Sequence, residues 1–95
     1  MKWGIYMRTN KDFMLRKIAG ESILVATGDA TQRFNGMITL NEVATFIWEN
    51  IDACESEDEL IGKILSEFDI DEEIARSDAR EFIEKSLRVG IMHVS

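Results

Sequence analysis

A chain of 95 residues with a hydrophobic fraction of 45% can hold one domain with a single core. No segment is long and apolar enough to span a bilayer, and the first ten residues lack the apolar run of a signal peptide. The net charge of −7 argues against nucleic acid as a partner, because affinity for phosphates comes from clustered Lys and Arg. The single cysteine, Cys54, cannot form an internal disulfide, which indicates a reducing, cytoplasmic location.

Charge is unevenly distributed along the chain. Residues 1–33 hold six basic and three acidic side chains, whereas residues 34–95 hold five basic and fifteen acidic ones. A solvated acidic helical surface explains this asymmetry most simply, and an electrostatically steered partner is the alternative.

The first half of the chain predicts three short strands. Residues 13–18 and 22–27 flank the turn Ala19-Gly20-Glu21 and form a predicted hairpin. A third short strand, Met37-Ile38-Thr39, follows the turn signal Asn35-Gly36. Because sequential strands usually neighbour each other, the three are expected to form a meander.

The hydrophobic period then changes from two to about 3.6, which predicts three helices. Thr39 with Glu42, and Ser56 with Glu59, have the spacing of a capping box and mark the first two helix starts. The third helix is expected to start after Asp69 or Asp71 and to end at Gly90. Residues 91–94 can form a last extended segment.

The predicted order is therefore β-β-β-α-α-α, an α+β fold with a three-stranded antiparallel sheet followed by three helices. This is the make-up of a winged helix-turn-helix domain whose wing strands come first. Residues 13–95 are expected to form the domain, and residues 1–12 an N-terminal extension that is disordered or packs on a partner.

No catalytic, metal or cofactor site is evident in the sequence, so the chain is not expected to be an enzyme or to bind a cofactor. Its one histidine, His93, lies 39 positions from Cys54, and neither has an evident partner. No metal-ligand spacing and no glycine-rich phosphate loop occurs. The carboxylate clusters fall at predicted helix starts, where they offset the helix dipole.

Two features favour binding of a peptide. The predicted strand Met37-Ile38-Thr39 is short, uncharged and free of proline, so an edge there could accept a further strand. The alternative is that a loop or helix of the chain itself covers this edge. The expected core face of the last helix is marked by Ala75, Ala79, Phe82, Ser86 and Val89. A second stripe beside it is formed by Arg76, Arg80, Ile83 and Leu87. This stripe is either the wall of a groove, or a wider core edge whose arginines pair with nearby glutamates.

From Phe34 to Glu49 the sequence resembles the PqqD-like family, which comprises the recognition elements for precursors of ribosomally synthesised, modified peptides. LNEVATFIWE over residues 40–49 is the most specific match, and FMLRKIAGESILVATG over 13–28 and DELIGKILSEFD over 58–69 fit the same pattern. The FNGM turn, residues 34–37, differs from the founding quinone-pathway proteins, so the resemblance is to the broader family.

The resemblance implies a function: a chaperone that binds the leader of a precursor peptide as a strand added to the third strand, against the third helix. The partner would be a modifying enzyme, often a radical SAM protein. Transferred to this chain, the third strand is about 36–39 and the opposing helix about 71–89, the same two elements that the residues themselves indicate. We expect Arg76 and Arg80 to meet leader carboxylates, and Phe34, Ile83 and Leu87 to receive apolar anchors. The expected peptide-binding residues are Phe34, Gly36, Met37, Ile38, Thr39, Arg76, Arg80, Ile83 and Leu87. Two alternatives remain: a transcriptional regulator that binds DNA through the same scaffold, and a structural subunit that only stabilises an enzyme. The sequence leaves the oligomeric state open.

Overall fold

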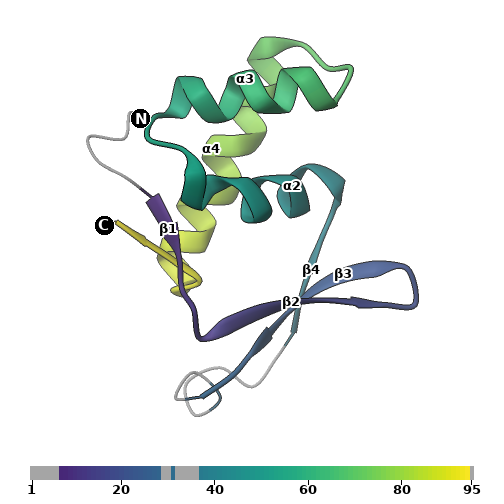
Figure 1. The fold of residues 1–95 in the computed structure, drawn as a ribbon, viewed down its shortest axis with the longest axis vertical. Helices are drawn as coiled ribbons and strands as arrows, with labels where there is room; N and C mark the ends of the chain where they lie inside the picture. Colours follow the sequence, from purple (N-terminus) through teal and green to yellow (C-terminus); the bar gives the residue numbers. More distant parts are fainter. Residues whose placement is uncertain (1–6, 29–30, 32–36, 95) are drawn as a thin grey trace.

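The computed structural model describes residues 7–28, 31 and 37–94 (Figure 1). Strands β2 (Phe13–Ile18), β3 (Glu21–Ala26) and β4 (Met37–Leu40) form an antiparallel sheet in the order β2-β3-β4. Ala19 and Gly20 connect β2 to β3 with φ values of 52° and 83°. Positive φ at both central residues is typical of the tight hairpin turn that matches strand twist. The predicted hairpin and third strand are confirmed.

Three α-helices follow the sheet, as predicted: α2 (Glu42–Asn50), α3 (Glu57–Glu67) and α4 (Glu72–Val89). A short 3-10 helix, η1 (Ile51–Ala53), continues α2. The Ser56 hydroxyl accepts a hydrogen bond from the Glu59 amide at 3.1 Å, as the capping-box spacing predicts. Helix α4 ends at Gly90, which has the left-handed φ of 92°.

The prediction that Thr39 caps the first helix was wrong. Thr39 lies inside β4, and the cap is Asn41, whose side-chain oxygen accepts from the Ala44 amide at 2.8 Å. Asparagine is as good a cap as serine or threonine, and the strand continues through Leu40 before the helix starts.

A second, two-stranded sheet joins the two ends of the described chain. β1 (Met7–Thr9) pairs antiparallel with β5 (Met92–Val94), the extended segment expected near the C-terminus. Met7 is buried, and the Asn10 amide donates to the Ile91 carbonyl at 2.9 Å. The part of the predicted extension from residue 7 onward therefore contacts the domain.

The core lies where the sheet meets the helices. Its fully buried large side chains come from β3, α2, η1, α3, α4 and the segment before β5: Leu24, Ile47, Ile51, Leu60, Ile61, Ile64, Ile83 and Ile91. Among the described helices, none has the length and apolar character needed to cross a bilayer.

Candidate binding groove

β4 is an edge strand of the sheet. It pairs with β3 from Ser22↔Leu40 to Val25↔Met37, and no other described strand pairs with its opposite edge. Backbone N–H and C=O groups along such an edge are available to a further strand. The open edge that the sequence predicted is therefore present in the described part of the fold.

The side chains of β4 alternate between the two faces of the sheet. Ile38 pairs across the ladder with the fully buried Leu24, and Leu40 is buried on the same face. Met37 and Thr39 are exposed, Met37 to 65%. The edge strand thus turns Ile38 and Leu40 toward the core side and leaves Met37 and Thr39 exposed on the other face.

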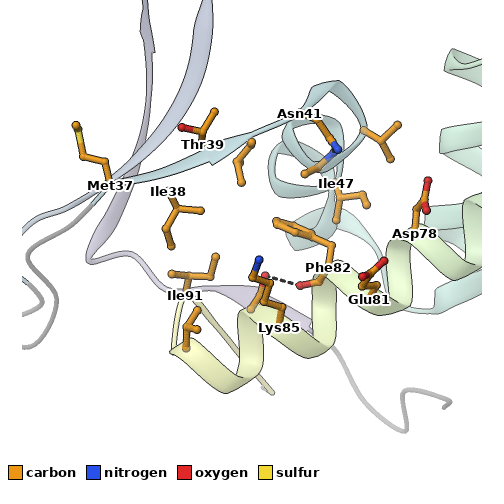
Figure 2. A pocket seen from close by; sticks show the side chains of 15 residues that line it. Met37, Ile38, Thr39, Asn41, Ile47, Asp78, Glu81, Phe82, Lys85 and Ile91 are labelled. Atoms are coloured by element: carbon orange, nitrogen blue, oxygen red, sulfur yellow. Dashed lines mark hydrogen bonds between the residues drawn. The ribbon is translucent and has the colours of Figure 1, made fainter.

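A groove of about 620 Å³ lies between β4 and α4, with α2 at one end (Figure 2). Its walls come from β4, α2 and α4, from Asn41 between β4 and α2, and from Ile91 before β5. The lining residues are Met37, Ile38, Thr39, Leu40, Asn41, Val43, Ala44, Ile47, Asp78, Glu81, Phe82, Lys85, Ser86, Val89 and Ile91.

The floor of the groove is apolar. Ile47, Leu40 and Ile91 are buried there, and Phe82 points into the groove from α4 (Figure 2). Ser86 is 1% exposed, but its hydroxyl donates to the Phe82 carbonyl at 2.7 Å, so it leaves no unsatisfied donor. Such a surface gains free energy by receiving apolar side chains from a ligand.

The predicted second stripe of α4 lies mostly on a neighbouring face of the helix. Arg76 and Arg80 bind the buried Glu57 carboxylate, with Nη1 of Arg76 at 2.9 Å and Nη2 of Arg80 at 2.8 Å from its Oε2. Arg76 also bridges to Asp58 and Glu72. These contacts join the start of α3 to α4 and occupy both guanidinium groups.

These contacts shift the pKa values of the groups involved. Burial alone would raise the pKa of Glu57, but hydrogen bonds from Arg80 and Arg76 outweigh it and hold that pKa below its ordinary value. The carboxylates around Arg76, Glu72 first, raise the pKa of its guanidinium. The cluster is therefore fully charged at neutral pH.

The structure brings only some of the predicted residues together. Met37, Ile38 and Thr39 line the groove, whereas Arg76, Arg80, Ile83 and Leu87 do not. Ile83 is fully buried in the core, and Leu87 packs against the core. This matches the alternative in which the second stripe is a wider edge of the core. Phe34 and Gly36 lie outside the described residues.

Sequence reasoning missed the α4 side of the groove. Phe82 and Val89 share a stripe with Ala75 and Ala79, and that stripe looked like the core face. In the structure Ala75 and Ala79 are buried, but Val89 is 44% exposed at the groove. Asp78, Phe82 and Lys85 are spaced so that they share one face of the helix. The spacing alone does not show which element of the fold, if any, packs against that face.

The described residues contain no group of three His, Cys, Asp or Glu side chains that could hold a metal ion. Cys54 is fully buried, and burial, followed by the nearby Glu59, raises the pKa of its thiol. His93 is exposed on β5. A buried thiol with a raised pKa is a poor nucleophile, so Cys54 lacks the features of a reactive cysteine.

The fold and the groove together define a small α+β domain of the winged-helix type with an open strand edge beside an apolar groove. A family model described as coenzyme PQQ synthesis protein D (PqqD) matches residues 18–92, and the chain belongs to this family.

Among solved structures, the chain is similar to one described as TbiB1 in complex with the TbiA(beta) leader peptide. The two share 16% identity with a TM-score of 0.70 over 90% of this chain and 94% of the other. A comparison with curated proteins finds no match.

Proposed function

We propose that this protein is a non-catalytic peptide chaperone that binds the leader of a ribosomally synthesised precursor peptide and presents it to a modifying enzyme. The observation that carries the proposal is the unpaired edge of β4 beside the apolar groove. Membership of the PqqD family supports it, and so does the similar fold of a protein solved with a leader peptide.

The leader would bind as a fourth strand of the β2-β3-β4 sheet. Backbone hydrogen bonds to β4 set its position, and alternate side chains enter the groove toward Phe82 and Ile47. Ordering a flexible peptide costs about 1–2 kcal/mol per residue, so backbone pairing alone gives little net affinity. Two or three apolar anchors, at about 1.5–3 kcal/mol each, bring the complex to about micromolar affinity.

Met37, Ile38 and Thr39 remain the proposed strand contacts, with Gly36 directly before them and Phe34 three positions before Met37. Phe82 and Val89 take the role of apolar contacts on α4, because they line the groove and Ile83 does not. An Ile83→Asp variant would place a charge in the core and would report on folding rather than on binding.

The test is a titration with fluorescently labelled leader segments, taken from whichever short reading frames are found to neighbour this chain's gene. Val89→Asp places a charge in the groove and should weaken binding about tenfold to a hundredfold, the loss of one apolar anchor. Ile74→Asp is the matched control, because Ile74 is a 50% exposed aliphatic residue of the same helix outside the groove. Equal affinities of both variants and the wild type would place the leader elsewhere.

We further propose that the partner enzyme is a radical SAM protein, as the family resemblance implies. Co-purification of the two proteins should become stronger when the leader peptide is present. Co-purification that is independent of the leader would instead support a purely structural subunit.

A further inference from the structure

The groove contains an ordered set of charges as well as an apolar floor. Of its lining residues only Asp78, Glu81 and Lys85 are charged, and all three are exposed on α4. None of the three forms an ion pair with another described residue, whereas Arg76 and Arg80 on the neighbouring face are both engaged. The groove therefore offers two carboxylates and one ammonium group to a ligand.

These charges lie in a defined order along the groove. Figure 2 shows Asp78 toward the Asn41 end of the groove and Lys85 closer to Ile38 and Ile91. Helix α4 thus runs in the direction opposite to β4: it passes first the C-terminal end of β4 and then the N-terminal end of β4. One end of the groove is acidic and the other is basic.

The sheet sets the direction of an added strand. β4 already pairs antiparallel with β3, and antiparallel pairs are slightly more stable per residue than parallel ones. A bound peptide strand (the guest) that runs antiparallel to β4 has its N-terminal residues at the Asn41 end, beside Asp78 and Glu81. Its C-terminal residues lie toward Lys85.

The spacing of the guest charges follows from helix and strand geometry. Lys85 lies about 6 Å along the helix axis from Glu81 and about 10 Å from Asp78, at 1.5 Å per residue. A strand covers those lengths in about two and three residues. Because alternate side chains face the groove, the charged pair in the guest must be separated by an even number of positions, about two or four.

We infer that the groove selects peptides by charge order: a Lys or Arg facing Asp78 and Glu81, followed two or four residues later by an Asp or Glu facing Lys85. This inference rests on the proposed strand addition to β4 and names the class of guest that the site accepts. It also replaces Arg76 and Arg80 with Lys85 as the group that meets a guest carboxylate.

In the experiment, the full chain is immobilised and used to select binders from a displayed library of random dodecapeptides. The wild type should enrich peptides in which a basic residue precedes an acidic one at this spacing. The variant Asp78→Lys, Glu81→Lys, Lys85→Glu should enrich the opposite order. The control variant Glu73→Lys, Glu84→Lys, Arg88→Glu changes the net charge of the same helix equally but lies outside the groove, and it should select as the wild type does.

An enriched peptide is then synthesised together with a version in which its basic and acidic residues are exchanged. The wild type should bind the enriched peptide about tenfold more tightly, since exposed ion pairs contribute modestly and add up. The preference should decrease at high salt. Circular dichroism of each variant verifies that it is folded.

The outcomes separate this inference from the proposed function. Enriched peptides that protect β4 amides from hydrogen exchange but show no charge order overturn the charge inference and leave strand addition standing. If no peptide is enriched, or if the enriched peptides protect no β4 amide, strand addition fails and the charge inference fails with it.

Discussion

Glu57 is a buried carboxylate whose charge is balanced by two arginines from another helix. It is 7% exposed, and both Arg76 and Arg80 donate to it. Glu57→Gln should lower the free energy of unfolding by about 1–3 kcal/mol, because it leaves two guanidinium groups without their shared partner. Chemical denaturation at neutral pH measures this. Glu72→Gln, which removes an exposed partner of the same Arg76, should cost less than about 1 kcal/mol.

The same residue predicts a pH dependence. The folded-state pKa of Glu57 lies below its ordinary value of 4.5, so its contribution to stability is complete above pH 4.5 and is lost as the pH falls through the folded-state pKa. The stability difference between wild type and Glu57→Gln should therefore be constant near neutral pH and shrink in acid. A difference that grew on acidification would contradict this account of the cluster.

Cys54 provides a second test at the scale of one residue. The thiol is fully buried and burial raises its pKa, so both access and thiolate content are low in the folded chain. We expect a thiol reagent at neutral pH to label it slowly, at a rate that rises with denaturant in parallel with unfolding. Rapid labelling in native buffer would show that the helix end around Cys54 opens readily.

At the scale of an element, two glycines should respond in opposite directions to alanine. Gly90 ends α4 with a φ of 92°, where a Cβ is strained, so Gly90→Ala should cost about 1–2 kcal/mol. Gly62 lies within α3, and a Cβ built there meets nothing within 4 Å. Gly62→Ala should therefore stabilise the fold by about 0.5–1 kcal/mol. Thermal denaturation of both variants compares them directly.

Besides its pairing with β5, strand β1 is attached to η1 through one side chain, that of Asp52. The carboxylate of Asp52 accepts from both the amide and the hydroxyl of Thr9, each at 2.7 Å, and from Lys11. Asp52→Ala should weaken this attachment by about 1.5–3 kcal/mol, the value of hydrogen bonds to a charged group. Hydrogen exchange at the Thr9 amide should accelerate accordingly, whereas Glu49→Ala, which removes an exposed carboxylate of α2, should not change it.

At the scale of the whole molecule, the winged-helix arrangement raises the question of DNA binding. The first turn of α3, the second helix of the α2-α3 pair, carries the exposed carboxylates of Asp58 and Glu59, and the whole chain has a net charge of −7. Carboxylates facing phosphates are repulsive, so the scaffold lacks the electrostatic basis of DNA affinity. We expect no electrophoretic shift of duplex DNA at low salt. A salt-sensitive shift would favour the regulator alternative.

Most of the fold was predictable because most local signals agreed with the final structure. The Ala19-Gly20 turn, the Ser56 cap and the Gly90 stop depend on a few neighbouring residues and on backbone geometry alone. The Thr39 cap failed for a local reason as well, because Asn41 two positions later competes for the same role.

The candidate site was predictable on one side only. The open edge at Met37–Thr39 follows from an uncharged, proline-free strand that is the last of three. The face of α4 that lines the groove was assigned to the core, because Phe82 and Val89 continue the spacing of Ala75 and Ala79. A helix with apolar residues on two adjacent faces does not show by itself which face its neighbours cover.

The sequence alone determined the order of elements, the absence of evident catalytic motifs and the edge available for a further strand. These follow from periodicity, turn chemistry and residue type, which act over a few neighbouring positions. Only the tertiary structure decided that Glu57 engages Arg76 and Arg80, and that Asp78, Glu81 and Lys85 line the groove. The reason is physical: the angle at which α3 and α4 pack places side chains nineteen or more positions apart in contact, and it selects the helix face that remains open.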